Sequence, residues 1–151
     1  MKRTKLTRMI LLVVVVVTAL GAGYVYKEYN RKRPNAAEIN ADFSLAPGEL
    51  AKSFASDINA ANAKYLNKII AINSVVDRTE KDENGLYTII FKDSSTNTSI
   101  RCLMDSAENS KAAVIRPAMQ IQVKGFCTGY NPDDMGLGAD IILQRTVIHQ
   151  P

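Results

Sequence analysis

The segment Met119–Gly129, with the sequence MQIQVKGFCTG, constrains the fold most, because its residues alternate in character with the period of a β-strand. Apolar side chains fall on one face of this predicted strand and polar ones on the other, with Phe126 as the apolar exception on the polar face. Gly125 is in register with the apolar face, where a strand glycine commonly marks a bulge or a sharp bend. Such a bend indicates a small β-barrel.

Length and composition predict one globular domain, since the chain has 151 residues, of which 46% are hydrophobic and 23% charged. The formal charge of +4 is unevenly distributed. Eight of the 19 Lys and Arg residues precede Pro34 and are opposed there by Glu28 alone, whereas the chain from Pro34 onward has 11 basic and 14 acidic residues, a net charge of −3. The domain therefore lacks the basic balance that is typical of nucleic-acid binding.

The N-terminus has the pattern of a membrane anchor. A basic start, residues 1–8, precedes the uncharged run Met9–Tyr26 of 18 residues. As a helix rising ~1.5 Å per residue, this run spans about 27 Å, just enough for a bilayer core. The first basic cluster favours the inside, which predicts a single inner-membrane span with the domain facing the periplasm. Small residues at Ala19–Gly23 leave a cleaved secretory signal as the alternative.

A tether and a helix are expected next. Residues 27–43 are polar and include Pro34, as in a linker, so the domain is expected to occupy residues 44–151. Ser44 is expected to cap a helix with Pro47 in its first turn. Apolar residues spaced by three and four form one stripe of this helix: Leu50, Phe54, Ile58, Ala61 and Tyr65. The stripe is expected to pack on its own domain, with a partner-binding face as the alternative.

Alternation and turn signals predict four further strands, at Lys68–Val76, Leu86–Lys92, Ser99–Met104 and Ala139–Ile148. The charged segment Asp77–Gly85 is expected to connect the first two, because it ends in an Asn-Gly turn signal. A short helix, capped by Asp105 or Ser106 and ended by Pro117, is expected before the strand at Met119–Gly129. The fold class is therefore mainly β, with an additional helix in front and a transmembrane helix at the N-terminus.

Three strands, a helix and two strands is the order of the OB-fold, a partly open five-stranded barrel. Several segments resemble the tRNA_anti-like family, OB-fold proteins of bacteria that are membrane-anchored or lipoproteins and are frequent in Bacteroidetes: KYLNKIIAINSVV (Lys64–Val76), SIRCLM (Ser99–Met104), VKGFCTG (Val123–Gly129) and ADIIL (Ala139–Leu143). The resemblance covers roughly Leu45–Ile148. The sequence departs from the family pattern at two points. Ser74 stands where the family usually has Gly, and there is no lipobox Cys, so a protein span is expected in place of a lipid anchor.

The resemblance implies kinship with the anticodon-binding OB-folds of tRNA synthetases, yet the residues argue against nucleic acid. Single-strand binding by OB-folds needs a basic groove and outward aromatic rings. If Tyr87, Ile89 and Phe91 face the core, strand Leu86–Lys92 presents no aromatic residue outward. A shift of one residue would expose Tyr87 and Phe91 instead. Binding of single-stranded nucleic acid is therefore the alternative function.

No catalytic, cofactor or metal pattern appears. His149 is the only histidine, and Asp133 with Asp134 lack the spaced oxygens of a calcium loop. We predict a non-enzymatic binding module of the cell envelope that needs no cofactor or metal, with a protein or an envelope glycan as its ligand. The candidate ligand-binding residues, on the usual OB face and its last loop, are Lys92, Arg101, Lys124 and Tyr130.

Two cysteines, Cys102 and Cys127, fall on inward faces of their predicted strands. A pair of cysteines in an exported domain is more often bonded than free, which predicts a disulfide closing a loop of about 25 residues. Their strands are not neighbours in an OB barrel, so two buried free thiols are the alternative.

Overall fold

The computed structural model describes residues 17–26, 36 and 39–149. The chain forms two compact units, Met1–Pro34 and Asn35–Pro151, whose boundary falls within the predicted tether 27–43. In the first unit residues 17–26 are helical, and apolar side chains such as Leu20 and Val25 are exposed. Within the described residues, no helix is both long and apolar enough to cross a membrane. Residues 9–16 of the predicted span lie outside the described part of the chain, as do most of the tether residues.

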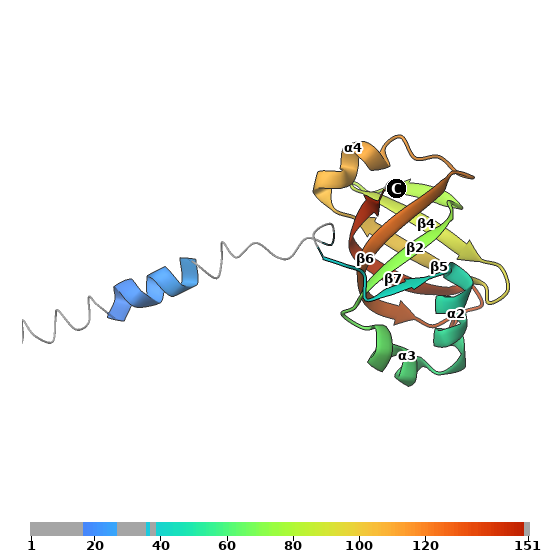
Figure 1. Cartoon of the computed structure of the whole chain (residues 1–151), viewed down its shortest axis with the longest axis horizontal. Helices are drawn as coiled ribbons and strands as arrows, with labels where there is room; N and C mark the ends of the chain where they lie inside the picture. Colours follow the sequence, from blue (N-terminus) through green and yellow to red (C-terminus); the bar gives the residue numbers. More distant parts are fainter. Residues whose placement is uncertain (1–16, 27–35, 37–38, 150–151) are drawn as a thin grey trace, which may run out of the picture. The chain divides into compact units, whose positions relative to one another are not determined.

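The second unit is mainly β, with one sheet of seven strands in the order β1-β2-β6-β7-β5-β4-β3 (Figure 1). The strands are β1 (Phe43–Leu45), β2 (Ile69–Val75), β3 (Arg78–Lys81), β4 (Tyr87–Asp93), β5 (Thr98–Met104), β6 (Gln120–Asn131) and β7 (Ala139–His149). The pairs β1–β2 and β5–β7 are parallel, and the other neighbouring pairs are antiparallel.

The five strands predicted from the sequence are all present, but the five-stranded barrel is corrected to a seven-stranded sheet. β3 lies in the segment expected to be a charged connection; it pairs with β4 and contains no apolar residue. β1 has only three residues and pairs with β2. The polar residues of β3 carry no hydrophobic alternation, and the alternation of β1 extends over only three residues, too few to indicate a strand, so neither could be predicted.

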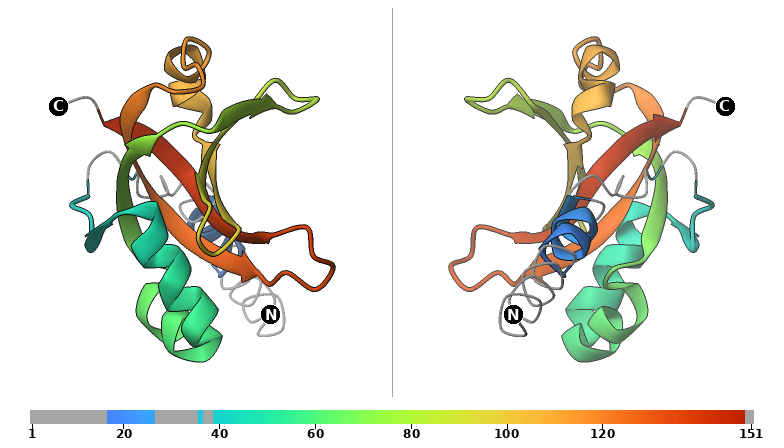
Figure 2. Two further views of the ribbon diagram at one scale, coloured as in Figure 1. Left: turned by 90° about the vertical axis from the view of Figure 1, so that its right-hand side faces the viewer. Right: turned by 90° about the vertical axis from the view of Figure 1, so that its left-hand side faces the viewer.

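The sheet curves back on itself at Val76 and Asp77. The N–H of Val76 donates to the carbonyl of Met119 beside β6, and the N–H of Asp77 donates to the carbonyl of Ile90 in β4, each at 2.9 Å. Two consecutive residues thus bond to strands that are far apart in the sheet order, which requires a strong bend (Figure 2). The inner face of the bent sheet holds the core, including Ile72, Phe91 and Leu143.

Helical segments lie at the two ends of the sheet (Figure 1). Helices α2 (Pro47–Ser56) and α3 (Ile58–Tyr65) are at one end, and the 3-10 turn η1 (Ser106–Glu108) with α4 (Asn109–Ala112) is at the other. The side chain of Asp105 accepts from the N–H of Ala107 at 3.0 Å, which confirms the predicted cap.

The predicted single helix is in fact two helices. Asp57 has an extended backbone (φ −156°, ψ 102°), and its side chain caps α3 by accepting from the N–H of Ala60 at 3.0 Å. Ser44 lies in β1 and caps nothing, because α2 begins after Ala46. The change of direction at Asp57 leaves Ile58 41% exposed, whereas the rest of the predicted stripe is buried.

Candidate functional site

The strand register defines an outer face over β3, β4 and β5. Ile90 of β4 pairs with Arg78 of β3 and with Arg101 of β5. The residues on either side of Ile90, Ile89 and Phe91, are fully buried in the core, so Arg78, Ile90 and Arg101 face outward. Although it faces outward, Ile90 is fully buried. Its cross-strand neighbours are two arginines, and the aliphatic stems of such side chains cover apolar surface.

Ion pairs neutralise the arginines of this outer face. Arg101 donates from Nη2 to Glu80 Oε2 at 2.6 Å, and Arg78 donates from Nε to Glu80 Oε1 at 3.0 Å. Arg78 also donates from Nη1 to Asp77 Oδ2 at 2.8 Å. Burial alone would raise the pKa of Glu80, but the hydrogen bonds from Arg78 and Arg101 outweigh it and lower that pKa. Two carboxylates therefore balance two guanidinium groups.

The structure brings together two of the four predicted ligand-binding residues. Lys92 is exposed on β4, opposite Ser99 and two residues along from the Ile90–Arg101 pair. Arg101 shares this face, although its guanidinium is already paired. Arg78 and Glu80 were missed because their segment was expected to be a connection; their spacing of two residues with opposite charges was the available signal.

The other two predicted residues lie elsewhere. Lys124 is on β6 between Ala71 and Val147, and its Nζ donates to the carbonyl of Ile39 at 2.7 Å. Tyr130 pairs with the core residue Ile141 and faces inward. Its ring stacks on Phe54, with centroids 4.8 Å apart and an interplanar angle of 18°. Burial, together with the charge of Asp133, raises the pKa of Tyr130. Neither side chain joins the outer face of β3, β4 and β5.

Two loops flank the outer face, and both project to the same side of the sheet (Figure 2). The turn between β3 and β4 contains Gly85 at φ +81°, as the Asn-Gly signal predicted. In the loop between β6 and β7, the side chains of Met135 and Leu137 are 84% and 85% exposed. These two are the most exposed large apolar side chains of residues 39–149, which makes the loop tip an apolar feature beside the outer face.

No Phe or Tyr side chain among residues 39–149 is exposed. Phe43, Tyr87 and Tyr130 pack against the core, and Phe126 lies under Arg145, whose guanidinium carbon is 4.3 Å from the ring centroid. The expected inward register of Ile89 and Phe91 is confirmed. The described part of the domain thus has no aromatic platform on which bases could stack.

Cys102 and Cys127 are both fully buried and free. Each pairs with Leu143 of β7, Cys102 from β5 and Cys127 from β6. Because one strand separates them, their Cα atoms are roughly 10 Å apart, two strand spacings, beyond the reach of a disulfide. The predicted disulfide is therefore corrected to two buried thiols. Within the described residues, no group of three or more His, Cys, Asp and Glu side chains could hold a metal ion.

The thiols should be unreactive in the folded protein and free after unfolding. Burial raises the pKa of Cys102, and it raises the pKa of Cys127 to about 11, so both thiols are protonated at neutral pH. Titration with a thiol reagent should find two thiols per chain in denaturant and almost none without it. A denatured monomer without reactive thiols would show that the disulfide exists after all.

Comparison with known proteins assigns the chain to a family. The tRNA_anti-like family model matches residues 1–141, so the chain belongs to this family and has its OB-type fold. The resemblance found in the sequence is confirmed. No curated protein sequence matches the chain.

Three solved structures are similar to this chain to different degrees. One is a protein of Klebsiella pneumoniae, provisionally described as a nucleic acid-binding lipoprotein, with a TM-score of 0.55 and 14% identity over 76% of this chain and 94% of that one. An aspartyl-tRNA synthetase of Leishmania major, also provisionally described, has a TM-score of 0.45 and 10% identity over 70% of this chain and 20% of that one. An asparaginyl-tRNA synthetase of Pyrococcus horikoshii has a TM-score of 0.39 and 12% identity over 58% of this chain and 21% of that one.

Proposed function

We propose that this protein is a non-enzymatic binding module of the cell envelope, and that the outer face of β3, β4 and β5 binds a segment of another envelope protein. The observation that supports this most is the pairing of both arginines of the face: Arg78 and Arg101 form ion pairs with Asp77 and Glu80. An anionic ligand such as a phosphate backbone would have to displace these carboxylates from the arginines. The loss of the existing ion pairs would then offset the new contacts with the ligand.

A protein ligand fits the surface better than a glycan or a nucleic acid. Met and Arg are enriched in the centres of protein interfaces, and the face carries Arg78 and Arg101 beside a loop tip with Met135 and Leu137. Leu103, at the far end of β5, is also exposed. Without an exposed Phe or Tyr ring among residues 39–149, the outer face offers sugar rings and bases no such ring on which to stack.

Photo-crosslinking in the cells that make the protein tests this proposal. A photoreactive phenylalanine analogue at Lys92 or at Leu103 should give a discrete adduct whose mass spectrum identifies an envelope protein. The matched control is Val114, which is exposed on the chain after α4 and lies outside the face. Adducts of the same pattern from all three positions, or none from Lys92 and Leu103, would contradict the proposal.

We also propose that residues 9–26 anchor the protein in the inner membrane, with the domain in the periplasm. The uncharged run between basic flanks supports this, as does the helix at residues 17–26 with its exposed apolar side chains. The lipoprotein description of the Klebsiella protein agrees with an envelope location.

Protease added to spheroplasts should digest the domain and leave a small fragment in the membrane. Osmotic shock alone should release no soluble domain, because the anchor is uncleaved. Protection of the whole domain would reverse the orientation, and release of a shorter soluble chain would show that the segment is a cleaved signal.

Binding of single-stranded nucleic acid is the second candidate function. The Klebsiella protein of similar fold carries that description, and Lys92 is an exposed cation on the outer face. The net charge of −3 from Pro34 onward opposes it.

A further inference from the structure

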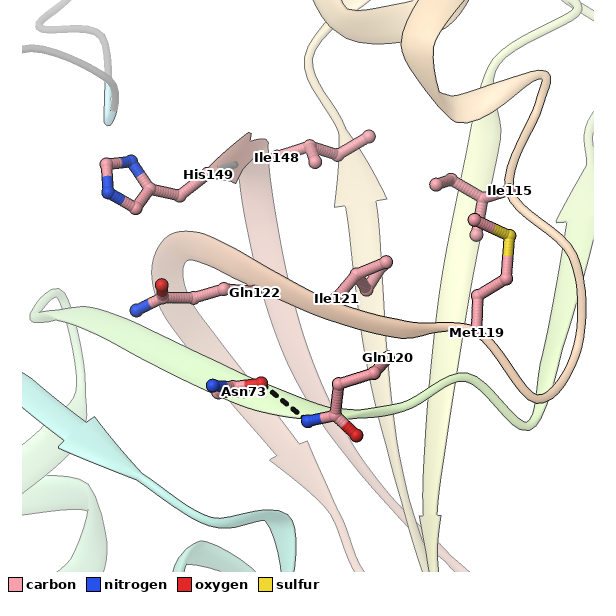
Figure 3. A pocket seen from close by; sticks show the side chains of 8 residues that line it. All are labelled: Asn73, Ile115, Met119, Gln120, Ile121, Gln122, Ile148 and His149. Atoms are coloured by element: carbon pink, nitrogen blue, oxygen red, sulfur yellow. Dashed lines mark hydrogen bonds between the residues drawn. The ribbon is translucent and has the colours of Figure 1, made fainter. Parts of the chain in front are cut away.

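A hollow of about 280 Å³ lies where β7 ends beside the start of β6 (Figure 3). One side of it is apolar and is formed by Ile115, Met119, Ile121 and Ile148. The other side is polar and is formed by Asn73, Gln120, Gln122 and His149. This hollow uses strands other than those of the outer face proposed above.

The hollow surrounds an open strand edge. Ile121 lies on one side of β6, while Gln120 and Asn73 lie on the other (Figure 3). Side chains from both faces of a strand can line one hollow only where no neighbouring strand separates them. β7 pairs with β6 as far as His149 opposite Gln122, so the stretch of β6 before Gln122 has no partner on that side among the described residues.

The backbone of Gln120 points to this open edge. In an antiparallel ladder, alternate residues direct both their N–H and C=O to the same neighbour. The N–H of Val76 donates to the carbonyl of Met119 on the β2 side, so Ile121 and Val123, two and four residues further along, direct their backbone groups to β2. Gln120 and Gln122 therefore direct theirs to the β7 side. For Gln120 the described residues supply no strand there.

A regular continuation of β7 would pair with Gln120 only in part. The register that pairs Gln122 with His149 would bring Pro151 opposite Gln120. Proline has no N–H, so a continuation of β7 would leave the carbonyl of Gln120 without a donor. A residue with an N–H at this position would satisfy both backbone groups of Gln120.

We propose that this edge is a second binding site, which takes an uncharged, extended peptide segment by strand addition to β6 at Gln120. Main-chain hydrogen bonds give such sites affinity, and pockets for alternate side chains give them specificity. The residue opposite Gln120 directs its side chain to the polar side of the hollow, where the amides of Gln120 and Asn73 lie. Its two neighbours direct their side chains to the apolar side, where the isoleucines lie. The preferred sequence is therefore aliphatic, polar, aliphatic.

The polar side of the hollow suits a neutral polar side chain of the ligand. Gln120 Nε2 donates to Asn73 Oδ1 at 2.6 Å, which holds the two amides together and leaves Gln120 Oε1 and Asn73 Nδ2 for a ligand. Amides offer a donor and an acceptor side by side, as a hydroxyl or another amide requires. Since no Lys, Arg, Asp or Glu lines the hollow, a charged side chain would lose hydration without gaining a partner.

The test uses the full chain in detergent micelles with isotope-labelled isoleucine methyl groups. The probe is acetyl-Val-Thr-Val-amide. Titration should shift the methyl signals of Ile115, Ile121 and Ile148 saturably, with a Kd on the order of millimolar for so small a ligand. Ile58, which is exposed on α3, serves as the internal reference and should not shift.

A second probe carries a methyl group on the threonine nitrogen and so lacks the N–H meant for Gln120. It should bind about tenfold more weakly, the loss expected from one hydrogen bond and an unsatisfied carbonyl. Ile121→Asp should abolish binding of the first probe, whereas Ile58→Asp should not change it. Equal affinity of the two probes, saturation of the same methyl groups by N-acetylglucosamine, or no shift up to about 10 mM of the first probe would overturn the proposal.

Discussion

Replacing Phe54 by Ala is expected to lower the free energy of unfolding of the second unit by about 3–5 kcal/mol, the usual cost of removing a buried aromatic ring. Phe54 is fully buried, stacks on Tyr130 at 4.8 Å, and lies 6.1 Å from the ring of Tyr65. It is the side chain through which α2 packs on both α3 and β6. Its loss leaves a cavity bordered by α2, α3 and β6, and none of these elements can move alone to fill it.

Urea unfolding of the chain from residue 35 measures this effect. The midpoint should fall while the m-value stays unchanged, because the same surface is exposed on unfolding. The matched control is Ile58→Ala on the neighbouring helix, which removes a side chain that is 41% exposed and should cost less than about 1 kcal/mol. If the two substitutions cost the same, Phe54 does not hold the helices to the sheet.

Replacing Gly125 by Ala is expected to cost about 2–3 kcal/mol, the upper part of the range for overpacking a core. A Cβ at Gly125 would lie 2.5 Å from Thr146 Oγ1 and 3.3 Å from both the carbonyl oxygen of Gln144 and Leu143 Cβ. Thr146 is fully buried, so its hydroxyl has no open space into which to move. Relief would require the bulged segment of β7 to shift.

Gly129 provides the control for Gly125, because it lies in the same strand and a Cβ there meets nothing within 4 Å. Gly129→Ala should change the free energy of unfolding by less than about 0.5 kcal/mol. Thermal or urea unfolding of both variants decides the matter. Similar stability of the two variants would mean that β6 and β7 do not approach as closely as the structure shows.

Hydrophobic alternation identified the strands that build the core. β6 was predicted within two residues of its bounds, and Gly125 was predicted to mark a bulge. The register confirms that bulge, since the residues paired with Lys124 and Phe126 are Val147 and Gln144. Burial on one face forces such an alternation, which is why these strands could be read from the sequence. β3 buries no residue, so nothing in its sequence distinguished it from a loop.

The candidate site was harder to predict because bulges change which face a side chain occupies. Tyr130 was expected at the ligand face as a residue of the last loop. Between Cys127 and Gly129 the pairing with β7 advances by one residue where β6 advances by two. The extra residue, Thr128, reverses the alternation and turns Tyr130 to the core. Lys92 and Arg101 precede any bulge in their own strands, and their shared face was predicted correctly.

The ion pairs of the outer face also could not be predicted from the sequence. Arg101 was predicted as a ligand-binding cation, but pairing with Glu80 depends on the β3–β4–β5 register. A strand that was not predicted cannot contribute its charges to a predicted surface. Arg101 was therefore predicted to offer its charge to a ligand, whereas in the folded domain Glu80 compensates that charge.

If this OB-fold domain recognises a ligand other than nucleic acid, as we propose, it should not bind oligonucleotides, and a titration tests this most directly. The chain from residue 35 is titrated with labelled single-stranded DNA and RNA of roughly 12 nucleotides, a typical OB-fold site, over a series of salt concentrations. We predict no saturable binding near physiological salt, since the domain is acidic and the arginines of its outer face are paired. Micromolar binding that weakens steeply with salt, and that Lys92→Ala or Tyr87→Ala reduces without unfolding the domain, would contradict the account.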